Sequence, residues 1–150
     1  MTGAETASIH ASAVQVGDRA VLIRGPSGSG KSQLAFQLIL AGRSGQLPTT
    51  ELVGDDRVHL QACDGQLVVR PAPALAGLIE IRGLGIRGCD FVEHATVGLV
   101  VDLDAEDAER MPPPESLITT ILGVEIPRIP VGRGVSPLPL VVAALTTTKS

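Results

Sequence analysis

The chain has 150 residues, 44% of them hydrophobic, and a formal net charge of -4. This composition predicts one folded domain with a substantial core rather than a disordered chain. The mild negative charge argues against broad nucleic-acid binding, and the near absence of aromatic residues removes the stacking rings that single-strand binders use. No run reaches about 18 apolar residues, and the N-terminus resembles no signal peptide, so we expect a cytoplasmic protein without a membrane span.

The two cysteines, Cys63 and Cys89, are far apart in the sequence. They form no Cys-x-x-Cys pair, so neither a structural metal site nor a disulfide framework is indicated. We expect both to be small buried apolar side chains in a reducing compartment.

The first elements of the chain are predicted to be a strand and a helix. The apolar run at 19–25 ends in glycine and predicts a buried strand. Residues 31–42 carry apolar side chains at helical spacing, and Gly42 stands where a helix would stop. After a loop at 43–50, residues 51–62 predict a strand that is interrupted at Gly54-Asp55-Asp56.

The second half of the chain is predicted to be mostly β-structure. Asp64-Gly65 predicts a tight turn between two strands, and residues 96–104 predict another buried strand. The acidic, proline-bearing segment 105–116 is expected to be exposed. Residues 118–145 predict short strands broken by prolines and then an apolar end, and we expect 146–150 to be a frayed tail. Strands with a hairpin and few helices predict a mixed α/β sheet.

The segment 77–88 combines a strand pattern with several glycines. Alternation over 79–82 places two isoleucines on one face and an acid and a base on the other. One interpretation is that the charged face borders a site and the glycines allow a close approach. The alternative is an exposed strand with salt bridges and a flexible loop after it. The residues concerned are Ile79, Glu80, Ile81, Arg82, Gly83, Gly85 and Gly88.

A phosphate-binding motif lies between the first predicted strand and helix. Gly25-Pro26-Ser27-Gly28-Ser29-Gly30-Lys31-Ser32 fits the Walker A pattern, in which backbone N–H groups and a helix N-terminus surround a phosphate. Lys31 supplies a cation, and the Ser32 hydroxyl is a Mg²⁺ ligand. The alternative is a Gly/Ser turn that happens to contain a lysine. The motif predicts a P-loop nucleotide-binding fold with a mixed sheet and few helices, formed by residues 1–150 as a single domain.

A P-loop also needs a carboxylate near its Mg²⁺. Asp102 ends an apolar run and resembles a Walker B acid, although it could equally be a strand-end residue that faces solvent. Asp55, Asp56 and Glu80 are the competing candidates. Asp55 and Asp56 would repel each other if both were buried, and the pKa of one would then rise, which suits a group that takes up a proton. The alternative is that both lie in a solvated turn.

The residues together resemble the HPr kinase/phosphorylase family. The Walker A motif alone would not name a family, but the segment 78–86 combined with Asp-Asp-Arg-Val is far more specific. The matching segments occur in the family's order and span Ile9 to Ala144. They are I-H-A-S-A-V at 9–14, G-P-S-G-S-G-K-S at 25–32, L-V-G-D-D-R-V at 52–58, L-I-E-I-R-G-L-G-I at 78–86 and I-P-V-G-R-G at 129–134.

The resemblance implies a role for each matching residue. Lys31 would bind phosphate, and Ser32 and Glu80 would bind Mg²⁺. Asp55 would be the proton acceptor in kinase action and the donor in the reverse reaction. His10 would support Asp55.

Further roles concern the arginines. Arg82 would neutralise the charge of the transferring phosphoryl group or pair with a carboxylate. Arg133 would lie in the segment linked to dephosphorylation, where Gly134 replaces the family's Asn. The counterpart of another family arginine, before the segment 121–127, is expected at Arg110 by a loose alignment.

The resemblance implies ATP- and Mg²⁺-dependent phosphorylation of a serine on HPr in phosphotransferase-system regulation, with phosphorolysis of phosphoserine-HPr as a reverse reaction. It implies a compact form comprising the catalytic domain, and a homo-oligomer, which in the family is a hexamer. The apolar run 138–145 is either core or a contact surface. The alternatives are a P-loop kinase of a small molecule and a non-enzymatic nucleotide-sensing module. No Arg-rich lid and no Asn-Lys-x-Asp motif occur, which argues against nucleotide kinases and GTPases.

Overall fold

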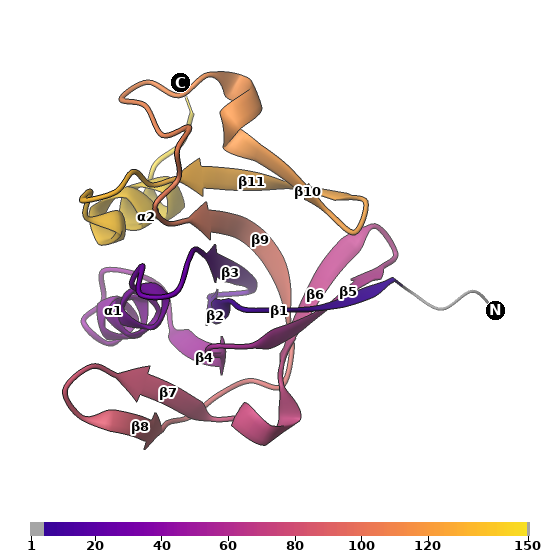
Figure 1. The fold of residues 1–150 in the computed structure, drawn as a ribbon, viewed down its shortest axis with the longest axis vertical. Helices are drawn as coiled ribbons and strands as arrows, with labels where there is room; N and C mark the ends of the chain where they lie inside the picture. The colour runs from indigo at the N-terminus through magenta and orange to yellow at the C-terminus, as the bar shows by residue number, and fades with distance from the viewer. Residues whose placement is uncertain (1–4, 150) are drawn as a thin grey trace.

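A computed structural model describes residues 5–149 of the chain (Figure 1). Its elements alternate between short strands and turns, with an α-helix early in the chain and another near its end. The elements are β1 (Thr6–Ile9), β2 (Ser12–Val16), β3 (Arg19–Arg24), α1 (Lys31–Arg43), β4 (Thr50–Gly54), β5 (Val58–Cys63), β6 (Gln66–Pro71), the 3-10 turn η1 (Pro73–Leu75), β7 (Leu78–Ile81), β8 (Gly85–Gly88), β9 (Ala95–Asp102), the 3-10 turn η2 (Pro114–Leu117), β10 (Ile118–Ile121), β11 (Val124–Pro130) and α2 (Pro137–Thr146).

Nine strands form one mixed sheet with β9 at its centre. The order is β1-β5-β6-β9-β3-β2-β4, and β11 pairs with β9 and with β10. Strand β9 runs parallel to β3 along one edge, and its other edge pairs first with β6 and then with β11. The remaining hairpin, β7–β8, is a separate two-stranded sheet that contacts α1 through β7. The predicted mixed α/β fold is therefore confirmed.

Two apolar cores occupy the two faces of the central strands. Alternation along β3 sends Val21 and Ile23 into a cluster with α1 and α2, and Leu22 into a cluster with β5 and β6. In Figure 1 the two helices lie together on one side of the central strands, and β5 and β6 lie on the other. Strand β3 is buried on both faces, which explains its continuous apolar sequence.

Several predicted elements are confirmed. Strand β3 and helix α1 lie where the sequence predicts them, and β9 matches the predicted strand at 96–104. Asp64 and Gly65 both have positive φ, 52° and 77°, in the tight turn that joins the antiparallel strands β5 and β6. The interrupted strand at 51–62 is two strands, β4 beside β2 and β5 between β1 and β6, because the chain turns sharply after Gly54.

The C-terminal helix α2 was not predicted, and neither were β1 and β2. Helix α2 begins with Pro137 at its first position, as helices commonly do. Its sequence has almost no polar residues, so no helical periodicity is visible. Val141 is buried against the core while Leu140 and Leu145 are exposed, so the run 138–145 is core on one side only. The helix also extends to Thr146, into the predicted tail, whose last residue lies outside the described part of the chain.

The prediction that both cysteines are buried is wrong for Cys63. Cys63 ends β5 beside the tight turn and is exposed, whereas Cys89 is half-buried. Partial burial raises the pKa of the Cys89 thiol, with smaller contributions from nearby charges. Between residues 5 and 149 no helix is both long and apolar enough to cross a bilayer.

Gly42 does not end α1 but lies in its last turn, where the helix approaches β4 closely. A Cβ at this position would lie 2.8 Å from the side chain of Thr50 and 2.9 Å from its backbone nitrogen. This close approach requires glycine, because the backbone of β4 cannot move aside without disturbing its pairing with β2.

We predict that Gly42→Ala lowers the free energy of unfolding by about 1–3 kcal/mol, because overpacking outweighs the better helix propensity of alanine. Chemical denaturation measures this. Gly132→Ala is the matched control, because its Cβ would meet its nearest neighbour at an ordinary 3.4 Å. Equal stability of Gly42→Ala and wild type would contradict the close approach.

Candidate active site

The Walker A loop connects β3 to α1, as the motif requires. Strand β3 ends at Arg24 and α1 begins at Lys31, so residues 25–30 form the loop. Gly30 is the N-cap of α1 with φ 100°, a left-handed conformation that favours glycine. The first N–H groups of an α-helix have no partners within the helix and carry its positive end, so the geometry of this loop suits an anion.

Lys31 folds back over its own loop. Its Nζ donates to the backbone carbonyl of Gly25 at 2.8 Å and lies 3.2 Å from that of Pro26. The ammonium group is therefore held at the mouth of the loop by carbonyl oxygens. The same donors can bind phosphate oxygens in their place, which is the function of the lysine in this motif.

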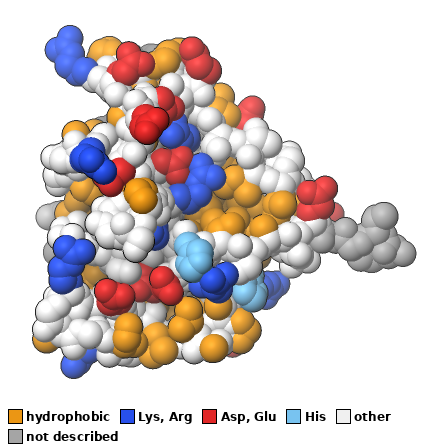
Figure 2. All heavy atoms as spheres, viewed as in Figure 1, with side chains coloured by type: hydrophobic (Ala, Val, Ile, Leu, Met, Phe, Trp, Pro, Cys, Tyr) orange, Lys and Arg blue, Asp and Glu red, His pale blue; other side chains and the backbone are white. Residues whose placement is uncertain are grey.

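A cleft of about 990 Å³ opens beside the loop, between α1 and the β7–β8 hairpin. Figure 2 shows acidic side chains gathered near a histidine and a basic side chain on this face. The cleft brings together most of the residues that the sequence analysis selected. Its lining consists of His10, Gly25, Pro26, Ser27, Gly28, Gly30, Lys31, Ser32, Gln33, Phe36, Gln37, Asp56, Glu80, Ile81 and Arg82.

Ser29 differs from the other loop residues. Its hydroxyl is buried and has no hydrogen-bond partner among residues 5–149, and the residue lines a smaller cavity of about 330 Å³ near the start of α2. Its backbone N–H donates to Pro26 and closes the loop. A contact between Ser29 and a nucleotide remains a prediction.

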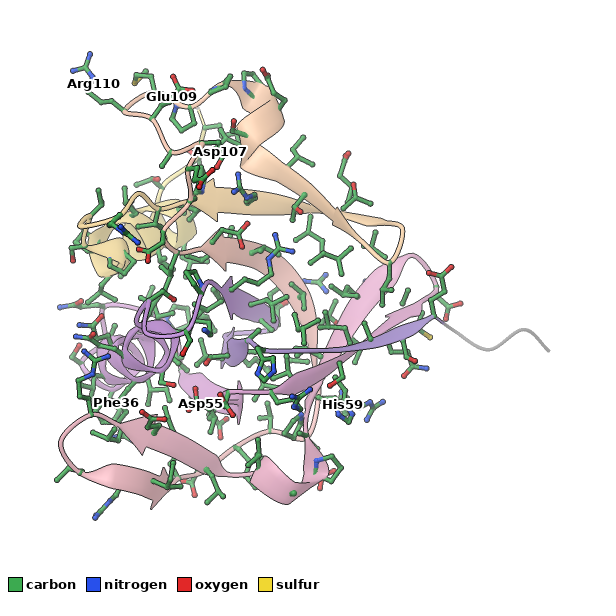
Figure 3. The ribbon with its side chains drawn as sticks, viewed as in Figure 1. Phe36, Asp55, His59, Asp107, Glu109 and Arg110 are labelled. Atoms are coloured by element: carbon green, nitrogen blue, oxygen red, sulfur yellow. The ribbon has the colours of Figure 1, made fainter. Side chains whose placement is uncertain are left out.

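Asp55 lies beneath the cleft, directly after β4, and accepts hydrogen bonds from residues of β2, α1 and β7. Its side chain follows β4 and is buried, with the residue 3% exposed. Ser12 of β2 donates to Oδ1 at 2.6 Å, and Ser32 of α1 donates to both oxygens at 2.7 and 2.9 Å. The backbone N–H of Glu80 in β7 donates to Oδ2 at 3.0 Å. Figure 3 shows Asp55 near Phe36 in the region between α1 and β7.

Ser12 is a part of the site that the sequence analysis missed. It is fully buried, and its hydroxyl donates to Asp55, a residue distant in the sequence. An isolated serine in an apolar strand gives no signal by itself. Ser12 lies inside the segment I-H-A-S-A-V that resembles the family, but its place beside Asp55 follows from the pairing of β2 with β4.

Glu80 and Arg82 project into the cleft, as the alternation in β7 predicts. Ile79 is buried and Ile81 half-buried, whereas Glu80 and Arg82 are exposed. Within residues 5–149 Arg82 forms no ion pair, and it lines the cleft. The backbone contact between Glu80 and Asp55 fixes this strand beside the loop.

The oxygen donors of the cleft suit Mg²⁺. The Ser32 hydroxyl and the Glu80 carboxylate are hard ligands, and Asp55 holds the hydroxyl in place through its proton. Within residues 5–149 no cluster of three or more His, Cys, Asp or Glu side chains could hold a metal alone. A magnesium ion here would take its remaining ligands from nucleotide phosphates and water, as Mg²⁺ commonly does.

The adjacent acids Asp55 and Asp56 are placed in different environments. The N–H of Arg57 donates to the carbonyl of Asp55 at 2.8 Å and closes a three-residue turn. Asp56 has φ 68° at the centre of this turn, the sign of the rare and strained form of the γ-turn. Asp55 therefore points into the protein, whereas Asp56 is exposed and lines the cleft.

His10 lines the same cleft from the turn between β1 and β2. Its Nε2 lies 2.9 Å from a terminal nitrogen of Arg57. The other terminal nitrogen of Arg57 donates to Ser8 in β1 at 3.1 Å. His10 is therefore held by a residue that the sequence analysis assigned no role.

Asp102 does not fit either predicted interpretation, because it is an ion-paired structural residue. Arg24 binds both of its oxygens at 2.7 and 2.8 Å, and Arg128 donates to Oδ2 at 2.6 Å. Partial burial would raise the pKa of Asp102, but the hydrogen bonds and charges of Arg24 and Arg128 outweigh it and hold this pKa below its ordinary value. Through these two arginines Asp102 links β9 to β3 and to β11. Arg128 also forms an ion pair with Asp107.

Two predicted arginines lie outside the cleft lining. Arg133 is exposed in the loop before α2, and Arg110 is exposed in the segment 105–116. Figure 3 places Arg110 at the opposite end of the molecule from Asp55. Their predicted catalytic roles gain no support from this geometry. His59 and His94 are both exposed.

The whole chain resembles characterised proteins of one kind. Residues 2–150 match the model of the HPr Serine kinase C-terminal domain family. The HPr kinase/phosphorylase of Geobacillus thermodenitrificans is 35% identical over 84% of this chain and 42% of its own length. That of Mycoplasma mycoides is 34% identical over 96% of this chain and 48% of its own length. The chain thus spans less than half of these relatives.

A solved structure shares the fold. The HPr(Ser) kinase/phosphatase from Coxiella burnetii superimposes with a TM-score of 0.72 at 28% identity, covering 93% of both chains.

We predict that Asp102→Asn lowers the free energy of unfolding by about 2 kcal/mol near pH 7, because two arginines lose a charged partner. Since folding lowers the pKa of Asp102, its stabilisation is present above the unfolded pKa and is lost as the pH falls through the folded pKa. The difference between variant and wild type should therefore shrink below about pH 4. Denaturant titrations at both pH values measure this, with exposed Asp18→Asn as the control.

Proposed function

Because the chain belongs to the HPr Serine kinase C-terminal domain family, we propose that it transfers the γ-phosphoryl group of ATP to a serine hydroxyl of HPr. The observation that carries the proposal is the contact of Asp55 with both Ser32 and the strand of Glu80. This contact joins Asp55, which follows β4, and the strand of Glu80 to the serine of the Walker A motif. We extend the proposal to a cytoplasmic, homo-oligomeric protein that acts in phosphotransferase-system regulation.

The loop and its lysine would bind the nucleotide. The N–H groups at the start of α1 would bind phosphate oxygens, and Lys31, which now donates to the carbonyl of Gly25, would supply a cation to them. Ser32 and Glu80 would hold Mg²⁺, which neutralises charge on the β- and γ-phosphates when bound. Arg82 stabilises the charge of the transferring group from the β7 side.

Asp55 is proposed to accept the proton of the substrate serine as the serine oxygen attacks the γ-phosphorus. Both of its oxygens already accept hydrogen bonds, so one donor must turn away for the substrate hydroxyl to approach. Ser32 is that donor at Oδ2, because it shares its one proton between both oxygens and can keep its bond to Oδ1 while the substrate hydroxyl approaches Oδ2. Asp56 is the second candidate for this role, because it already lines the cleft.

The reverse reaction is part of the proposal. Inorganic phosphate would attack the phosphorus of phosphoserine, the bond to the serine oxygen would break, and pyrophosphate would leave. The names of the relatives, which include both a kinase and a phosphorylase or phosphatase, support this direction. Arg133 is proposed to serve it.

We predict that Lys31→Ala lowers the rate of phosphoryl transfer at least about 100-fold, because a preorganised cation is lost from the transferring group. The assay follows label from γ-labelled ATP to HPr. Lys149→Ala, which removes the other lysine of the chain, should retain wild-type activity. Label on a small metabolite, or nucleotide binding with no transfer by the wild type, would contradict the assignment to HPr.

We predict that Asp55→Asn abolishes transfer but retains ATP affinity in the absence of Mg²⁺, because the Walker A loop itself is unchanged. Asp56→Asn should reduce transfer less. Single-turnover transfer and equilibrium binding of ATP in a chelator measure the two properties. Retained transfer by Asp55→Asn together with its loss in Asp56→Asn would assign the proton acceptor to Asp56.

A further inference from the structure

We propose that Arg57 is a positioning residue that holds His10 in one tautomer, with the hydrogen on Nδ1, so that His10 serves the cleft as a hydrogen-bond donor. The inference deepens the proposed function, because it assigns the chemistry of a residue that lines the proposed reaction site. It also excludes His10 as the group that removes the serine proton.

The hydrogen bond between Arg57 and His10 determines the tautomer. A guanidinium group has only donors, so the His10 nitrogen 2.9 Å away must be the acceptor. That nitrogen is Nε2, and an imidazole that accepts through Nε2 carries its hydrogen on Nδ1. The tautomer is thus inferred from the partner of the ring.

Arg57 is itself fixed by two contacts. Its other terminal nitrogen donates to Ser8, and its backbone N–H closes the turn on Asp55. The strained φ of Asp56 in this turn is an independent sign of function, since such strain persists where the surrounding structure enforces it, commonly at active sites. One turn therefore directs Asp55 towards Ser32 and Arg57 towards His10.

The arrangement makes His10 an improved donor. With Nε2 occupied by Arg57, Nδ1 is the ring nitrogen left for another partner. A cation bonded to one side of the ring polarises the N–H on the other side, which strengthens a hydrogen bond to an anion. The Asp56 carboxylate and the oxygens of a phosphoryl group are the anionic partners that this cleft would offer.

The tautomer can be measured without any assay of activity. Long-range proton–nitrogen NMR on the full chain with isotope-labelled histidine distinguishes a protonated from an unprotonated ring nitrogen, and His10→Asn identifies the His10 signals. We expect the wild type to show a protonated Nδ1, and Arg57→Ala to shift His10 towards the other tautomer. Arg70→Ala, beside His59 on the neighbouring strand, should leave the His10 signals unchanged.

A protonated Nε2 or averaged signals in the wild type would overturn the proposal, as would unchanged His10 signals in Arg57→Ala. Arg57→Lys retains a donor and should restore part of the wild-type pattern. Because these signals need neither ATP nor HPr, the proposal on Arg57 can fail or hold whether or not the chain phosphorylates HPr.

Kinetics provide a second test. We expect Arg57→Ala to lower kcat by about 10–100-fold, as the loss of a supporting partner commonly does, with the KM for ATP unchanged. If Arg57 acts through His10, then Arg57→Ala should have no further effect in a His10→Asn background. Fully additive losses would show that Arg57 acts independently of His10 and would overturn its positioning role.

Discussion

The carboxylate of Asp55 is the interaction on which the site depends. It is almost fully removed from solvent, and a buried charge is tolerated only when donors surround it. Those donors come from β2, from the first turn of α1 and from the backbone of β7. The need to satisfy one carboxylate therefore fixes the Walker A serine and the strand of Glu80 relative to each other. Within the described part of the chain the β7–β8 hairpin is a separate sheet, and this contact together with the burial of Ile79 holds it beside α1.

The three charged residues after β4, Asp55, Asp56 and Arg57, face different partners. In the sequence they are only a run of charges. Asp55 turns inward to the loop, and Arg57 turns to His10. Asp56 bears the backbone strain between them and remains in the cleft. The strained turn is stable because its two neighbours are both anchored by hydrogen bonds.

Local patterns predicted the parts of the fold that local interactions determine. The strand–loop–helix unit around Lys31, the turn at Asp64-Gly65 and the alternating faces of β7 all follow from residue spacing. Helix α2 and Ser12 did not follow, because an apolar segment without periodicity and an isolated buried serine acquire meaning only from elements distant in the sequence. The two interpretations of Asp102 stayed open for the same reason. Its resemblance to a metal acid is local, whereas its partners Arg24 and Arg128 come from neighbouring strands.

Asp102 belongs to the ion pairs that hold the central strands and not to the lining of the cleft. The acid at the end of the central strand is committed to two arginines that hold the ends of three strands together, while the cleft takes its carboxylates from the shorter segments after β4 and in β7. The residues that keep the chain folded and the residues that face the phosphate loop are therefore largely different sets. Substitutions in the segments that line the cleft can therefore change the reaction while the ion pairs of the central strands stay intact.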